Sequence, residues 1–221
     1  LQRKWTYPFH FIDFETCTVA LPFFKGMRPY ESIAFQFSHH IMHEDGRVEH
    51  KSQTLISEPG KFPNFDFIRE LEKSLNTDDG TIFRWAAHEN TILNQIKAQL
   101  LSYNQAPKDK NRLIKFIDTI TNDATRSTID LNEIAIQCYF HPETQARTSI
   151  KKVLPAVLKT SKLLKEEYSK PIGNNSSSLN FPETFVWFQE SDGEVTDPYE
   201  LLKRHLFNLF GKKTSNLSKD N

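Results

Sequence analysis

Two acidic residues stand one position apart in an otherwise apolar stretch near the start of the chain. Asp13 and Glu15 lie within residues 11–16, which read FIDFET and are typical of a β-strand. Side chains two positions apart in a strand point to the same face of the sheet, so both carboxylates face the same way. Adjacent carboxylates repel each other, and holding them beside a core is costly unless a cation neutralises them. The pair therefore predicts a metal site.

Mg²⁺ and Mn²⁺ prefer oxygen ligands, so these two ions suit the predicted site. Phosphodiester hydrolysis with two such ions, about 3.5–4 Å apart, needs several converging carboxylates. One strand supplies only part of that set. Glu89 can supply more, because it follows a short apolar strand at residues 81–86 and begins a predicted helix at 89–101. An acid at this place is also favoured by the helix dipole alone, which is the simpler interpretation of Glu89 taken by itself.

A further acid, Asp130, lies in the extended segment TIDL at residues 128–131. We include Asp130 as a candidate catalytic residue. Orienting a strand end or bonding a loop is its simpler interpretation.

Hydrophobic periodicity predicts the elements that must position these acids. Strands are predicted at residues 8–16, 32–42, 48–56 and 81–86, and helices after Pro63-Asn64 and at 89–101, 112–120 and 149–158. The hairpin-linked strands imply antiparallel pairing, and a helical crossover places the fourth strand parallel to the first. The predicted fold class is α/β, with a mixed sheet of three antiparallel strands followed by parallel strands, flanked by helices. The ribonuclease H-like fold has this order.

The length and composition indicate one substantial domain with an appendage. We expect a domain at residues 1–170, followed by a polar loop and a C-terminal helical extension at 171–221 that runs through Phe210. The chain starts at Leu1 and enters a strand almost at once, so we expect it to be part of a longer polypeptide.

The charge balance excludes a global field that would attract polyanions, because Lys+Arg and Asp+Glu are equal at 28 each. Any contact with nucleic acid must therefore use a local basic patch. No apolar run approaches the roughly 20 residues that span a bilayer, so no membrane partner is expected. The 2 cysteines fit a reducing compartment, and we expect a cytoplasmic protein.

The loop after the first strand offers candidate contacts to nucleic acid. Lys25 and Arg28 could contact phosphates, and Tyr30 could stack on a base. A solvated loop explains these residues equally well. His88, beside Glu89, could steer a water or contact substrate, although a lone histidine more often packs or forms a hydrogen bond.

A histidine cluster at residues 39–43 looks at first like a metal site. In a strand, however, His39 and His43 share a face while His40 points away. We therefore interpret the cluster as structural.

The FIDFET run resembles the first motif of the DEDD, or DnaQ-like, 3′-5′ exonucleases, in which D-x-E begins the sheet. Their second motif, N-x-x-x-D-x-x-x-L, corresponds to WAAHENTIL at residues 85–93, with Glu89 in place of the Asp and Trp85 in place of the Asn. The TIDL segment resembles the extended D-T-L or D-S-L segment of those nucleases.

The chain is more similar to an uncharacterised bacterial family, a domain of unknown function assigned to the same ribonuclease H-like superfamily. The shared segments are KGMRPY (25–30), IAFQFS (33–38), YFHP (139–142) and SIKKVLP (149–155). This resemblance covers roughly residues 8–202.

The resemblance implies a metal-dependent nuclease that hydrolyses phosphodiester bonds by a two-metal mechanism. Asp13, Glu15 and Glu89 would bind Mg²⁺ or Mn²⁺, and the substrate would be single strands or 3′ ends of DNA or RNA. The sequence does not separate DNA from RNA.

The chain departs from the nuclease pattern at the third motif, H-x-x-x-x-D or Y-x-x-x-D. Ala146 stands five residues after His141, and Phe210 stands five after His205. The last metal ligand is then either supplied by sequence outside this chain or missing. One alternative function is a catalytically inactive nucleic-acid-binding or scaffolding domain with an incomplete acid set. Another is a regulatory or interaction module.

Overall fold

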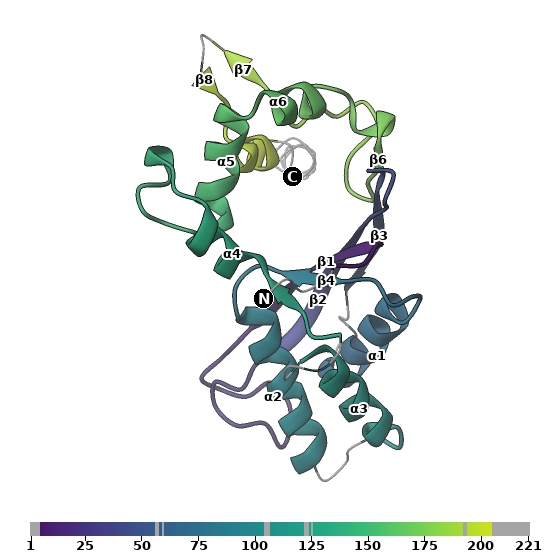
Figure 1. Cartoon of the computed structure of the whole chain (residues 1–221). Coiled ribbons are helices and arrows are strands. Elements are labelled where there is room, and N and C mark those ends of the chain that lie inside the picture. Colours follow the sequence, from purple (N-terminus) through teal and green to yellow (C-terminus); the bar gives the residue numbers. More distant parts are fainter. Residues whose placement is uncertain are drawn as a thin grey trace, which may run out of the picture. The chain divides into compact units, whose positions relative to one another are not determined.

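The computed structural model of the chain describes residues 5–55, 58, 60–103, 107–121, 124, 126–191 and 194–204. The chain forms two compact units (Figure 1). The first comprises residues 1–134 and 175–179, and the second comprises 135–174 and 180–221.

The first unit is built on a six-stranded mixed sheet. Its strands are β1 (Phe9–Cys17), β2 (Ile33–Met42), β3 (Val48–Leu55), β4 (Ile82–Arg84), β5 (Ile129–Asp130) and β6 (Ser176–Ser177). Their order across the sheet is β5-β4-β1-β2-β3-β6. β1, β2 and β3 pair antiparallel, whereas β4 pairs parallel with β1, and β5 parallel with β4. This arrangement confirms the predicted α/β class with a ribonuclease H-like order.

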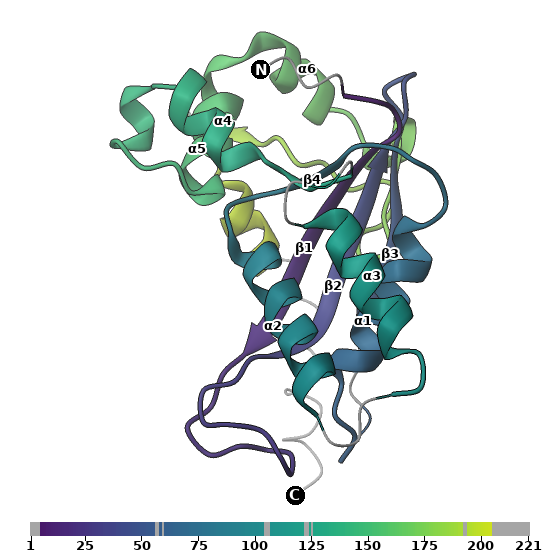
Figure 2. The same cartoon turned by 60° about the horizontal axis from the view of Figure 1, so that its bottom comes forward.

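Three helices cover one face of this sheet, as Figure 2 shows. They are α1 (Asn64–Leu75), α2 (His88–Ser102) and α3 (Lys110–Ile120). Their apolar stripes pack on buried residues of β1 and β2 such as Ile12, Phe14 and Phe37. Because side chains alternate along a strand, this packing turns Asp13 and Glu15 to the other face of β1.

One strand of this sheet was not predicted from the sequence. Residues 171–180 were expected to be a loop, but β6 forms there and pairs parallel with β3. The backbone N–H of Val48 donates to the carbonyl of Asn175 at 3.0 Å where the two segments meet. The edge of β3 thus gains hydrogen-bond partners. The polar sequence of residues 171–180 gives no indication that a strand forms there.

Helix α4 (Leu131–Cys138) begins in the first unit and ends in the second. The second unit also contains α5 (Ile150–Thr160), α6 (Lys162–Tyr168) and the hairpin of β7 (Glu190–Ser191) and β8 (Glu194–Val195). Residues 198–204 are helical, and the predicted continuation to Phe210 lies outside the described residues. None of the described helices is long and apolar enough to cross a membrane.

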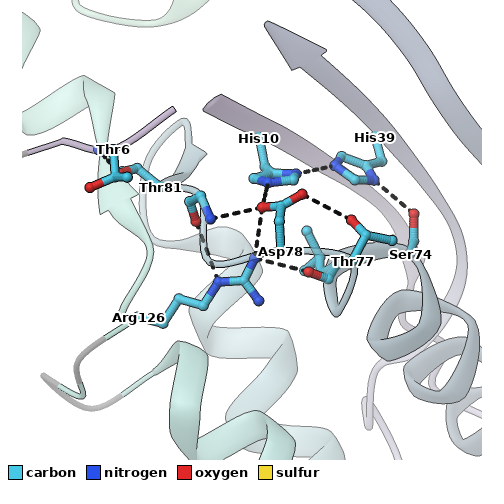
Figure 3. A network of polar contacts seen from close by, with 10 residues as sticks. Thr6, His10, His39, Ser74, Thr77, Asp78, Thr81 and Arg126 are labelled. Carbon is cyan, nitrogen blue, oxygen red and sulfur yellow. Dashed lines mark hydrogen bonds and ion pairs between the residues drawn. The ribbon is translucent and has the colours of Figure 1, made fainter. Parts of the chain in front are cut away.

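A chain of polar side chains around two buried histidines, His10 and His39, links β1, β2 and α1 in the first unit (Figure 3). Both ring nitrogens of His10 are engaged: Nδ1 lies 2.9 Å from His39 Nε2, and Nε2 lies 2.7 Å from Asp78 Oδ1. His39 Nδ1 lies 2.7 Å from Ser74 Oγ, which lies 2.8 Å from Ser52 Oγ. The role of His39 is therefore structural, as predicted.

Burial lowers the pKa of His10, and it lowers the pKa of His39 to about 3. Both rings are therefore neutral at pH 7, which fixes the direction of the hydrogen bonds. Asp78 accepts from His10, His10 accepts from His39, and His39 accepts from the Ser74 hydroxyl. Every ring nitrogen has a partner, as burial in a core requires.

Candidate metal site at the ends of β1 and β4

Asp13 and Glu15 share one face of β1, as their spacing predicts, and both side chains are exposed. The β1–β2 register shifts between Glu15 and Thr16, which marks a β-bulge at the end of this acidic segment. The pKa of Asp13 is raised, chiefly because neighbouring protein atoms displace water from its carboxylate. The charge of nearby His88 opposes this rise.

Glu89 lies in the first turn of α2, directly after β4. Its side chain is only 2% exposed, and Oε2 has no hydrogen-bond partner among the described residues. Burial raises the pKa of Glu89 to about 7. Its own backbone N–H lowers this pKa, whereas the charge of Asp13 raises it. The structure therefore brings Asp13 and Glu89 within electrostatic reach of each other at neighbouring ends of two parallel strands.

The turn from β4 into α2 is held by two side chains that lie side by side on adjacent strands. Arg84 Nη1 donates to Asp130 Oδ2 at 2.6 Å and also to the carbonyl of Ala86. Asp130 Oδ1 accepts from the Ala86 N–H at 2.9 Å and from the Asn132 N–H at 2.9 Å at the start of α4. Asp130 thus makes its contacts with a turn and a helix start.

His88 lies beside the acidic pair. Its Nε2 is 3.3 Å from the hydroxyl of Thr16, and its charge lowers the pKa of Asp13. The His88 side chain is exposed, so it can meet a ligand that approaches from solvent.

The predicted nucleic-acid contacts lie on the loop of residues 18–32, which joins the end of β1 to β2. Lys25, Arg28 and Tyr30 are all exposed, Tyr30 by 70%. Tyr30 has a φ of +60°, and its N–H donates to the carbonyl of Val19 at 2.9 Å. Met27 on the same loop is buried. The loop is continuous with the acidic strand, but none of these three side chains has a described contact with Asp13 or Glu89.

A complete metal cage is not assembled. Across the described residues, no group of three or more His, Cys, Asp or Glu side chains is arranged to hold a metal ion. Asp13 and Glu89 lie within electrostatic reach of each other, and Glu15 shares the strand face of Asp13 without completing a cluster of three. The feature that fits a cation is the unpartnered Oε2 of Glu89 beside a second carboxylate.

Sequence reasoning did not single out Arg84 or Ala86. One signal was available for Arg84, since it is a charged residue between Phe83 and Trp85 in a short apolar strand. Such a residue is rarely buried unless it is paired. No signal in the sequence marked Ala86, because alanine does not favour the conformation that it adopts here.

Comparison with known proteins shows the family. Residues 10–149 match the model of a family described as Domain of unknown function (DUF2779), and the chain belongs to that family. This finding confirms the prediction that the chain belongs to a family of unknown function. No curated protein and no solved structure matches the chain.

Proposed function

We propose that the chain is a metal-dependent nuclease that hydrolyses phosphodiester bonds with Mg²⁺ or Mn²⁺ bound at Asp13 and Glu89. The observation that carries the proposal is the burial of Glu89 with one carboxylate oxygen unpartnered and within electrostatic reach of Asp13. An ordinary acid at a helix N-terminus is solvated or bonded to backbone N–H groups. Glu89 also accepts backbone N–H hydrogen bonds, but its Oε2 stays buried without a partner and within electrostatic reach of Asp13, and a divalent cation would offset this cost.

Each acid has a distinct role in this proposal. Asp13 and Glu89 hold the cation from two adjacent strands, and Glu15 supplies a further oxygen from the face of β1 that it shares with Asp13. A divalent cation at this place supplies positive charge for the phosphate oxygens during hydrolysis. His88, exposed and next to Asp13, orients a water or a substrate oxygen through its ring.

The loop between β1 and β2 supplies the substrate contacts in this proposal. Lys25 and Arg28 contact phosphates, and the exposed ring of Tyr30 stacks on a base. Leu21 and Phe23 on the same loop are also highly exposed, at 82% and 66%. Stacking needs an unpaired base, so the substrate would be a single strand or a 3′ end.

One observation favours the alternative of a catalytically inactive nucleic-acid-binding or scaffolding domain. Only two of the candidate acids are brought together, and the described residues hold no cluster of three. A domain with this arrangement would bind nucleic acid through the same loop without cleaving it.

An assay with 3′-labelled single-stranded DNA and RNA in the presence of Mn²⁺ tests the proposal. We expect cleavage that a chelator abolishes and that Asp13→Asn and Glu89→Gln each reduce by about 100-fold or more. Glu70→Gln is the matched control, since Glu70 is a half-exposed acid on α1, paired with Lys73. Binding of either nucleic acid without cleavage in any divalent metal would instead support the inactive domain.

A further inference from the structure

We propose that Arg84 and Asp130 are positioning residues that lock the turn between β4 and α2 and thereby aim Glu89 at Asp13. The consequence for the site rests on the proposed function, whereas the lock itself is a property of the metal-free protein. The inference gives Asp130 a role different from that of a metal ligand.

The turn contains a residue in a conformation that its type disfavours. Ala86 has a φ of +70°. The left-handed region is unfavourable for a residue with a Cβ, and such residues persist only where the surroundings enforce them. Glycine would adopt this conformation freely, but the chain has alanine here.

The enforcement comes from both sides of Ala86. Asp130 Oδ1 accepts its N–H at 2.9 Å, and Arg84 donates to its carbonyl. Arg84 and Asp130 are themselves paired at 2.6 Å, with side chains only 10% and 7% exposed. Arg84 Nε also donates to the hydroxyl of Thr128 at 3.0 Å. The planar guanidinium can make these bonds together because its donors form a fixed fork.

The strand register explains why these two residues meet at this point. Arg84 of β4 lies directly opposite Asp130 of β5 in a parallel pair. Both strands end here, so the pair stands at the point where the chain leaves the sheet. The chain then passes through Ala86 and enters α2 at His88.

The turn controls the direction of Glu89. Glu89 is three residues past Ala86, in the first turn of α2, where the Thr91 N–H donates to the carbonyl of Ala87 at 3.0 Å. A change in the backbone angles of Ala86 would rotate the start of the helix and carry the Glu89 carboxylate away from Asp13. Functional groups need this kind of support, since small displacements are costly at a reactive site.

The hydrogen bonds of Asp130 leave little capacity for a metal ion. Oδ1 accepts from the backbone N–H groups of Ala86 and Asn132, and Oδ2 accepts from Arg84. A cation would have to displace a buried guanidinium to reach this carboxylate. The geometry therefore assigns Asp130 to the support of the turn.

The lock is tested first in the metal-free protein by NMR. The backbone chemical shifts and ³J coupling of Ala86 report its φ. We expect Arg84→Met, Asp130→Ala and the milder Asp130→Asn to shift them away from left-handed values. Arg112→Met is the matched control, because Arg112 pairs with Glu72 and Asp109 away from this turn. A left-handed signature that persists in all three variants would overturn the proposal, whether or not the protein is a nuclease.

The consequence for the site is tested by Mn²⁺ affinity. Asp130→Ala should weaken Mn²⁺ binding by about 10-fold. The double variant Asp130→Ala/Ala86→Gly should bind Mn²⁺ several-fold more tightly than Asp130→Ala alone, because glycine reaches the left-handed conformation without support. If Asp130 were a metal ligand, Ala86→Gly would restore nothing, and this result would overturn the positioning role. Absence of Mn²⁺ binding in the unmodified protein would contradict the proposed function, and the NMR result would still decide whether the lock exists.

Discussion

Mild acid should destabilise the protein through the buried pair His10 and His39. Both rings are 0% exposed and neutral, and burial lowers the pKa of each. In the unfolded chain both histidines therefore become protonated near pH 6.5, whereas in the folded protein they stay neutral at this pH. The stabilising contribution of each ring is complete above pH 6.5 and is lost as the pH falls toward the pKa of the folded state.

The magnitude can be worked out for His39, whose pKa falls from 6.5 to about 3. Between pH 7.5 and pH 5.5 the folded ring stays neutral while the unfolded one becomes largely protonated. The linkage relation gives a loss of about 1.4 kcal/mol in the free energy of unfolding over this interval. His10 acts in the same direction. The charged or titratable groups around the two rings are His40, His43, Lys51, Asp78 and Arg126.

The assay is urea unfolding at pH 7.5 and pH 5.5 for the unmodified protein and for His39→Gln. The variant should lose about 1.4 kcal/mol less between the two pH values, because it lacks the proton uptake of His39 in the unfolded chain. His141→Gln is the control, since His141 belongs to the second unit and is not among the groups around the two rings. An unmodified protein that is equally stable at both pH values would refute the reasoning, as would a His39→Gln variant with undiminished pH dependence.

Three further predictions concern stability and can be measured by urea unfolding. The rise in the pKa of Glu89 from 4.5 to about 7 corresponds to about 3 kcal/mol. Glu89→Gln should therefore increase the free energy of unfolding at pH 8 by up to this amount, and an unchanged or lower value would contradict its costly burial. Asn64 accepts from the Ala34 N–H at 2.8 Å and donates to Gln99 Oε1 at 2.6 Å, so Asn64→Ala should cost about 2–3 kcal/mol. Phe67 is 0% exposed in the core, so Phe67→Ala should lower the free energy of unfolding by about 3–5 kcal/mol. A loss below about 1 kcal/mol in Asn64→Ala or Phe67→Ala would contradict the buried role given to that residue.

Much of the first unit could be predicted because its elements follow strong hydrophobic patterns. The alternation around Ile12 and Phe14 and the helical stripe of α2 each encode one buried face. The parallel pairing of β4 with β1 follows from the helical crossover through α1, which leads from β3 into β4.

Other features depend on contacts between distant segments and leave no local pattern. β6 consists of Ser176 and Ser177, and it forms because the edge of β3 offers free backbone groups. The bulge at the end of β1 leaves Phe35 out of register with the alternation of β2. A single-sequence period cannot reveal either feature, since both are set by the partner strand.

In the candidate site, too, some features follow from local sequence patterns and others depend on distant segments. The shared face of Asp13 and Glu15 follows from strand period, and the position of Glu89 follows from the order of strand and helix. The partners of Asp130 could not be predicted, because they depend on the register between β4 and β5. A carboxylate in a sequence has the same appearance whether it binds a metal or supports a turn.

The central claim is that Asp13 and Glu89 together bind a divalent cation. Isothermal titration of Mn²⁺ into the unmodified protein, Asp13→Asn, Glu89→Gln and the control Glu70→Gln tests it most directly. The account predicts binding in the unmodified protein and in the control, with affinity reduced by about 10-fold to 100-fold in each of the other two variants. Mn²⁺ binding that is unchanged in both Asp13→Asn and Glu89→Gln, or no binding in the unmodified protein, would contradict the claim.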